Sequence, residues 1–129
     1  MYVGRIVAIG LTPQGQAAAM YRVSSRSFPN REARLGQNLV AIMPRPGHEA
    51  DLQKNPYIAY HCLRFAGACA IATNGSHTDP ITEKIAAGMS PRDALALSLL
   101  ALDYEKDQLD TPRIAGVVDR TSRRGWLGI

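Results

Sequence analysis

Hydrophobic residues in the first 74 positions alternate loosely with polar ones, in short runs rich in β-branched side chains, a pattern typical of β-strands. Turn-forming residues separate the runs: TPQGQ at 12–16 follows the first run, and Ala66 and Gly67 divide the last two. A hairpin, a single strand and a second hairpin are therefore expected. The predicted strands are residues 2–10, 17–25, 38–44, 57–65 and 68–74.

Helical patterns follow. Asp79 is expected to cap a first helix, with Pro80 at its first position and Gly88 at its end. Ser90, followed by Pro91, is expected to cap a second helix. Leucines at 95, 97, 99, 100 and 102 make that helix apolar on nearly every side, which predicts burial between two layers.

Two later apolar runs, 113–118 and 125–129, return to strand character. The sequence has no internal repeat or linker, so we expect a single α/β domain, residues 1–129, of antiparallel hairpins with a helical layer. No apolar run is long enough to span a membrane, and the first residues lack the layout of a signal peptide. A cytoplasmic protein without membrane contact is expected.

Positive charge is concentrated in the N-terminal third. Residues 1–48 contain six arginines and one acidic residue, or +5, whereas residues 49–129 contain nine basic and ten acidic residues, or −1. Arginine outnumbers lysine twelve to three, which favours forked recognition of phosphate or carboxylate. Nucleic-acid surfaces usually add stacking aromatics, and the two phenylalanines and one tryptophan here argue against that partner.

The cysteines and histidines indicate neither a disulfide framework nor a metal centre. Cys62 and Cys69 flank a predicted turn and are expected to stay reduced. The histidines lack metal-ligand spacing with either cysteine, so no metal site is expected. The histidines are His48, His61 and His77.

The segment 21–31 (YRVSSRSFPNR) is the first candidate site. Strand alternation is expected to place its first two arginines and the serine between them on one face, and Pro29 to bend the chain before the last two donors. These groups suit a phosphate cradle, although a solvated strand face with a surface loop is the alternative. The donors are Arg22, Ser24, Arg26, Asn30 and Arg31.

The segment 73–79 (TNGSHTD) is a second candidate, placed where a strand meets a helix. Gly75 allows close backbone approach, and Asn74 and Ser76 offer side-chain donors and acceptors beside the helix start. An anion or carboxamide site is one interpretation. Ordinary turn and cap chemistry is the other.

The segment 102–113 (LDYEKDQLDTPR) combines Asp103, Glu105 and Arg113 just past the apolar helix. A carboxylate emerging from such a helix is expected to be half-buried, with a pKa raised toward general-acid use; a solvated helix end is the alternative. Tyr57 and Tyr60 are predicted to lie on opposite faces of one strand, so only one of them should face a site.

Six segments, taken in order along the chain, resemble the archaeal-type inosine monophosphate cyclohydrolase family, and the resemblance covers essentially the whole chain. It implies the four-layered αββα sandwich of N-terminal nucleophile hydrolases. Family members continue beyond residues 125–129, so the chain is expected to lack the C-terminal part typical of the family. The segments are MYVGRIVAIG, YRVSSRSFPNR, NPYIAYHCLR, NGSHTDPI, LSLLALDYEKD and TPRIAGVVD.

The resemblance also implies an activity: dehydrative closure of 5-formamidoimidazole-4-carboxamide ribonucleotide to inosine monophosphate (IMP), without a cofactor. This reaction needs a held phosphate, stabilised charge on the formyl oxygen, and proton transfer. Arg31, Glu105 and Tyr60 or Tyr57 are the candidate catalytic residues. The candidate substrate-binding residues are Arg22, Ser24, Arg26, Asn30, Asn74, Ser76, Asp103 and Arg113.

Two other functions stay open. An N-terminal nucleophile hydrolase needs Cys, Ser or Thr freed at the chain start, and here Tyr2 follows Met1. A nucleotide-binding module without turnover is the stronger alternative. We expect a small purine nucleotide as partner, no nucleic acid, and a homo-oligomer.

Overall fold

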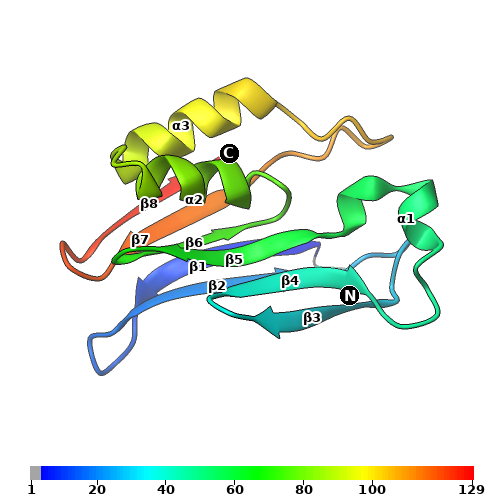
Figure 1. Ribbon diagram of the computed structural model, residues 1–129, viewed down its shortest axis with the longest axis horizontal. Helices are drawn as coiled ribbons and strands as arrows, with labels where there is room; N and C mark the ends of the chain where they lie inside the picture. The colour runs from blue at the N-terminus through cyan, green and yellow to red at the C-terminus, as the bar shows by residue number, and fades with distance from the viewer. Residues whose placement is uncertain (1–3) are drawn as a thin grey trace.

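The computed structural model describes residues 4–129 and shows an α+β fold with two antiparallel sheets, which confirms the expected fold class (Figure 1). The smaller sheet pairs β1 (Arg5–Leu11) with β2 (Ala17–Val23). The larger sheet has the strand order β3-β4-β5-β6-β7-β8. Its strands are β3 (Arg31–Gly36), β4 (Leu39–Pro44), β5 (Tyr60–Ala66), β6 (Cys69–Thr73), β7 (Ala115–Asp119) and β8 (Arg124–Gly128).

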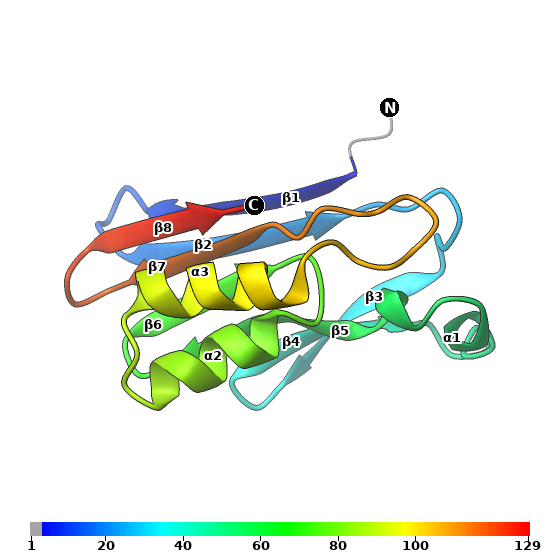
Figure 2. The ribbon, with the colours of Figure 1, turned by 90° about the horizontal axis from the view of Figure 1, so that it is seen from above.

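The elements form three layers. Helices α2 (Thr78–Ala86) and α3 (Pro91–Leu102) lie on one face of the six-stranded sheet, and β1 and β2 pack against the other face (Figures 1 and 2). Two short elements, α1 (Asp51–Lys54) and the 3-10 turn η1 (Pro56–Ile58), connect β4 to β5. Residues 4–129 thus form three layers, helices, larger sheet and smaller sheet, with no helical layer outside the two-stranded sheet.

The two sheets approach closely because small residues line the contact. A Cβ atom at Gly116 on β7 would lie 2.9 Å from Cγ2 of Ile9 and 3.0 Å from Cγ1 of Val7, so β1 rests directly on the backbone of β7. One apolar cluster lies between the helices and the larger sheet, and it includes Ile71 and Ile81. The other lies between the sheets: Ile42, Tyr60 and Cys62, with Tyr21, Val23, Val40 and Leu63 packed against them.

Most of the predicted elements are confirmed. The hairpins β1–β2 and β5–β6 and both C-terminal strands form, and Gly67 adopts a φ of 56° in the β5–β6 turn. Ser90 caps α3, because its Oγ accepts a hydrogen bond of 3.2 Å from the Asp93 N–H. Gly88, with a φ of 98°, follows the end of α2 as expected.

The start of α2 differs from the prediction. The helix begins at Thr78 with His77 as its N-cap, so the expectation that Asp79 caps it is wrong. The Asp79 carboxylate instead accepts 2.8 Å bonds from His61 and Arg64 on β5. Capping rules consider only residues close in sequence, and so they do not include His61 and Arg64 on β5 as partners of Asp79.

Two strand predictions are also wrong. The bend at Pro29 was expected to place Arg31 in a loop, but Arg31 starts β3, which pairs with β4 as the edge of the larger sheet. Tyr57 does not lie on the strand of Tyr60, because the side-chain oxygen of Asn55 accepts a 2.8 Å bond from the Tyr57 N–H and Pro56 starts η1. The argument that Tyr57 and Tyr60 occupy opposite faces of one strand therefore fails.

Helix α3 is not buried between layers, as its leucines suggested. Ala94, Leu95 and Ser98 face the sheet and are buried, but the side chains of Leu97 and Leu100 are 46% and 80% exposed. Among the described residues, a layer covers only the side of α3 that faces the larger sheet.

The remaining expectations concern membrane contact, the cysteines and the chain start. No helix within residues 4–129 is long and apolar enough to cross a membrane. Cys62 and Cys69 are buried free thiols, as expected. Met1 and Tyr2, which carry the argument against an N-terminal nucleophile, lie outside the described residues.

Candidate active site

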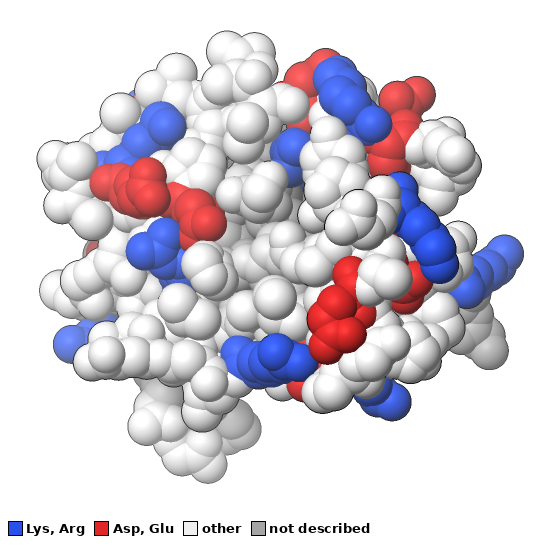
Figure 3. All heavy atoms as spheres, turned by 45° about the vertical axis from the view of Figure 1, so that its right-hand side comes forward, with Lys and Arg blue, Asp and Glu red and all other residues white. Residues whose placement is uncertain are grey.

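A cleft of about 870 Å³ opens at the end of the sheets where β1 begins and β2 ends. Its lining comes from the start of β1, the β2–β3 connection, the α1–η1 segment and the loop after α3. Figure 3 shows a hollow on this side of the molecule with charged side chains around it. The cleft thus collects residues that are far apart in the sequence.

The cleft lining is strongly cationic. It contains five basic side chains and a single acidic one, Asp107. The carboxylate of Asp107 accepts hydrogen bonds from the Thr111 N–H at 3.0 Å, the Thr111 hydroxyl at 2.6 Å and the Leu109 N–H at 3.1 Å. These bonds outweigh its partial burial and lower its pKa, so Asp107 holds the loop as an anion. The basic residues are Arg5, Arg26, Arg31, Lys54 and Lys106.

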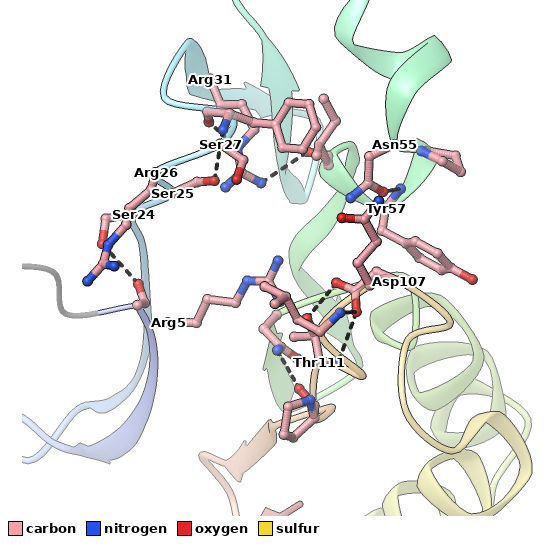
Figure 4. A pocket seen from close by; sticks show the side chains of 18 of the residues that line it. Arg5, Ser24, Ser25, Arg26, Ser27, Arg31, Asn55, Tyr57, Asp107 and Thr111 are labelled. Atoms are coloured by element: carbon pink, nitrogen blue, oxygen red, sulfur yellow. Dashed lines mark hydrogen bonds between the residues drawn. The ribbon is translucent and has the colours of Figure 1, made fainter.

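Arg5 reaches into the cleft from the start of β1, and Arg31 lies at the cleft wall at the start of β3 (Figure 4). Arg31 donates from Nε to the Phe28 carbonyl at 3.2 Å and from Nη1 to the Ile58 carbonyl at 3.3 Å. These bonds fix the guanidinium plane and use only part of its five donors. Two guanidinium groups held in a concave site are suited to phosphate or to an oxygen that develops negative charge.

Glu105 lies behind Arg5 and is completely buried, with Oε2 3.5 Å from Nη1 of Arg5. Neither carboxylate oxygen has a hydrogen-bond partner in the described part of the chain. Burial raises the pKa of Glu105, and the charges of Arg5 and Arg113 oppose that shift. The carboxylate is packed against Gly75, where a Cβ atom would lie 2.6 Å from Oε1. A buried carboxylate with unsatisfied oxygens beside a cleft is a candidate acid or base.

His77 contacts the guanidinium of Arg113, whose charge acts on Glu105. Its Nε2 lies 3.0 Å from the Ile114 carbonyl, and its Nδ1 lies 3.3 Å from Nη1 of Arg113. Nε2 therefore donates, and Nδ1 accepts from the guanidinium, which requires a neutral ring. Burial lowers the pKa of His77 to about 4, with a further contribution from the charge of Arg113.

The pKa of His77 predicts a pH-dependent contribution to stability. Between its folded pKa of about 4 and its ordinary value of 6.5, the unfolded chain binds the proton more strongly. Stability contributed by His77 is therefore lost as the pH falls through this window, by roughly 3 kcal/mol in full. We expect His77→Gln to remove this dependence, measured by urea unfolding across the window. The exposed His48→Gln is the control, and wild-type and His77→Gln curves that stay parallel would contradict the assignment.

A pair of tyrosines lies at the contact between the two sheets, and neither belongs to the cleft lining. The hydroxyl oxygens of Tyr21 and Tyr60 are 2.7 Å apart, and their rings meet edge to face at 64° with centroids 6.3 Å apart. Burial raises the pKa of Tyr60, whereas the charges of Arg31 and Arg5 lower it. Tyr57 lines the cleft, but in Figure 4 its hydroxyl points away from Arg5 and Arg31.

The predicted site residues separate into three groups. Ser24, Arg26, Arg31, Tyr57 and Asn74 line the cleft. Tyr60, Glu105 and Arg113 are buried. The others lie outside the cleft lining: Arg22, Asn30, Ser76 and Asp103.

Strand alternation failed for the first cluster because β2 ends at Val23. Ser24 and Arg26 thus belong to a connection, and Arg22 is exposed on β2 beside a second, smaller cavity. Asn74 is occupied as well: its Nδ2 donates to the Pro112 carbonyl at 2.8 Å and its Oδ1 accepts from the Ile114 N–H at 2.9 Å. The amide of Asn74 is therefore a clamp between β6 and the loop before β7.

The residues placed outside the lining have other partners. Asp103 pairs with Lys106 at 2.9 Å, and its carbonyl accepts a 2.8 Å bond from Nε of Arg113. Ser76 is exposed and lies 3.4 Å from Nη1 of Arg113. The Asn30 carbonyl accepts a 2.9 Å bond from the Arg45 N–H. These contacts hold the loops that border the cleft.

Sequence reasoning missed three of the basic lining residues: Arg5, Lys54 and Lys106. Arg5 interrupts an otherwise apolar first strand, and this was the available signal. The two lysines lie in polar surface segments, and nothing in the sequence marked them as site residues. No group of three or more His, Cys, Asp or Glu side chains in residues 4–129 is placed to share a metal ion.

The fold and the cleft define an α+β protein suited to an anionic small molecule. A family described as IMP cyclohydrolase-like protein matches residues 2–129. The chain therefore belongs to this family, as its sequence motifs indicated.

Curated relatives carry the name IMP cyclohydrolase. The protein of Methanocella arvoryzae is 64% identical over 100% of this chain and 62% of its own length. That of Methanosphaera stadtmanae is 52% identical over 100% of this chain and 63% of its own, and that of Halobacterium salinarum is 52% identical over 92% and 57%. The chain thus spans about three fifths of the length of the first two relatives.

Proposed function

We propose that this protein closes 5-formamidoimidazole-4-carboxamide ribonucleotide to IMP with loss of water. The observation that carries the proposal is the cationic cleft, with Arg5 and Arg31 in its lining, in a chain of the IMP cyclohydrolase-like family. A nucleotide monophosphate is an anion of a size that such a cleft holds. Membership of the family and relatives named for this activity support the same reaction.

We assign different steps of the reaction to different residues of the cleft lining. The 5′-phosphate needs several cationic donors, which Arg26, Lys54 and Lys106 supply from the cleft lining. Charge that develops on the formyl oxygen needs fixed donors in a poorly hydrated place, and Arg31 is the best fixed of these. Holding the formyl group against the carboxamide nitrogen makes the attack intramolecular and favourably oriented.

Proton transfer is assigned to Tyr60 and Glu105. Tyr60 protonates the formyl oxygen, and Glu105 takes the proton that the attacking amide nitrogen loses. Both groups are buried and neither lines the cleft, so the reacting end of the nucleotide must reach the deepest part of the cleft. The raised pKa of Glu105 brings it closer to the neutral range in which a base works best.

The direct test is a turnover assay. Purified protein is incubated with the formamido nucleotide, and IMP is quantified by chromatography, with heat-inactivated protein as control. IMP formation that scales with protein concentration supports the enzyme. Saturable nucleotide binding without product would support the nucleotide-binding module instead, and neither binding nor product would refute both.

The two tyrosines give a sharper test of the proton donor. Tyr60→Phe removes the hydroxyl that pairs with Tyr21, and we expect kcat to fall by about a hundredfold with little change in KM. Tyr57→Phe is the matched control, since its hydroxyl points away from Arg5 and Arg31, and its kinetics should be nearly unchanged. Steady-state kinetics on both variants decides, and a large loss in Tyr57→Phe with normal Tyr60→Phe would reverse the roles.

We extend the proposal to the setting of the enzyme. Its ligand is a small purine nucleotide and not a nucleic acid, it works in the cytoplasm, and it assembles as a homo-oligomer. The exposed leucines of α3 and the metabolic role of the relatives support these points. The three observed layers support kinship with the αββα sandwich of N-terminal nucleophile hydrolases, and residues 1–129 as part of one cyclohydrolase domain. Size-exclusion chromatography with light scattering tests the oligomer.

A further inference from the structure

We infer that Tyr21 is a positioning residue for the ring closure: its hydroxyl forms a hydrogen bond with the Tyr60 hydroxyl and fixes the position of the proposed proton donor. This inference rests on the proposed function, because it assigns a role to the partner of the proton donor. Tyr21 opens the segment 21–31 but is not one of the donors proposed from that segment.

The geometry of the pair restricts both side chains. Tyr21 comes from β2 in the smaller sheet and Tyr60 is the first residue of β5 in the larger sheet, so two separate backbones set the 2.7 Å distance. Tyr21 also packs against the apolar cluster that contains Ile42 and Cys62. Rotation of either ring would lose the hydrogen bond and the edge-to-face contact together.

The charges of Arg5 from β1 and Arg31 from β3 act on both phenols and lower the pKa of each. Tyr60 also faces Cys62 on its own strand. Burial raises the pKa of both phenols, but their mutual hydrogen bond raises the pKa of Tyr21 and lowers that of Tyr60. These opposite effects favour Tyr21 as the donor and Tyr60 as the acceptor.

The consequence for Tyr60 follows from the capacity of a phenol. A hydroxyl that accepts one hydrogen bond still has its own O–H to give, and Arg5 and Arg31 have no acceptor to receive it. Both arginines line the cleft, and their charges act on both phenols, so the pair lies within electrostatic reach of the cleft. The hydrogen bond from Tyr21 fixes the oxygen of Tyr60.

The proton balance of the reaction is consistent with this role. Tyr60 gives its proton to the formyl oxygen while Glu105 takes one from the attacking amide nitrogen. As the new hydroxyl leaves, it takes the proton from Glu105 and departs as water, and the nitrogen that joins the new double bond returns its proton to the Tyr60 phenolate. Tyr21 keeps its own proton throughout and stabilises that phenolate by its hydrogen bond.

The experiment is a double-mutant cycle with Tyr21→Phe, Tyr60→Phe and the double variant, using kcat for the formamido nucleotide. If Tyr21 acts through Tyr60, Tyr21→Phe should lower kcat about tenfold in the wild type and less than about twofold in Tyr60→Phe. KM should change little in each case. Tyr104→Phe, which removes an exposed phenol from the loop after α3, is the control.

A second readout needs no turnover. In protein with ¹³Cζ-labelled tyrosine at neutral pH, Tyr21→Phe should shift the Tyr60 resonance and leave those of Tyr57 and Tyr104 in place, because only Tyr60 loses a hydrogen bond. Equal kcat losses in both backgrounds, or an unshifted Tyr60 signal, would overturn the role of Tyr21. Absence of IMP formation in the wild type with a shifted Tyr60 signal would instead refute the proposed function and leave the hydrogen bond established.

Discussion

Replacing Arg31 by alanine should lower kcat/KM for ring closure by about a thousandfold while the fold stays intact. Its guanidinium is held by the Phe28 and Ile58 carbonyls, so its remaining donors meet the substrate without reorganisation. Developing charge on the formyl oxygen would lose a fixed, forked partner in a poorly hydrated site. Steady-state kinetics with purified variant measures the loss.

Arg34→Ala is the matched control for Arg31→Ala. Arg34 lies on the same strand, bonds to Glu32 and to the Pro44 carbonyl, and does not line the cleft. We expect its kinetics to be normal and both variants to keep the wild-type far-UV circular dichroism spectrum. Normal turnover in Arg31→Ala would remove Arg31 from the catalytic residues.

Glu105→Gln should lower kcat by between about a hundredfold and ten-thousandfold, because it removes the proposed base with little change in volume. Burial raises the pKa of the carboxyl, so its anionic form is lost at a higher pH than for an ordinary glutamate. The acidic limb of the wild-type kcat profile should therefore lie above the ordinary glutamate pKa and be absent from the variant. Kinetics as a function of pH measures both effects.

Folding must be checked in the same variant. The carboxylate of Glu105 lies near Arg5 and Arg113, and a neutral amide would leave these two cations without their counter-charge. Urea unfolding at each assay pH separates this loss of stability from the loss of chemistry, and the exposed Glu49→Gln serves as control. A folded Glu105→Gln with the wild-type pH profile would exclude Glu105 as the base.

The elements that sequence reasoning predicted correctly are those whose hydrophobic pattern reflects burial. The runs around Ile9, Ile71 and Val117 alternate or continue as expected because each faces the contact between layers. Strand β3 was not predicted. Its residues, REARLG, lie at a sheet edge and are largely exposed, so pairing with β4 makes them a strand and the local sequence pattern does not. Helix α3 shows the reverse error, since its apolar residues do not all have a covering layer.

The sequence predicted individual residues of the candidate site but not how these residues are arranged in space. Arg31 and Glu105 carry signals in their local segments, a cluster of arginines and a carboxylate after an apolar helix. The position of Arg5 depends on where β1 meets the loop after α3, and the pairing of Tyr21 with Tyr60 depends on how two sheets stack. Such long-range contacts leave no periodicity in the sequence. The bonds that occupy Asn74 are of the same kind, since they join residues about 40 positions apart.

The spread of the cleft lining along the chain, from Gly4 to Ile129, has a kinetic consequence. Each hairpin closes a short loop and forms early, but the walls of the cleft meet only after the largest loops of the chain have closed. A complete cleft therefore requires contacts between residues far apart in the sequence. In refolding from urea, recovery of nucleotide binding should therefore lag behind recovery of the β-sheet signal, and the two should share only the slowest phase.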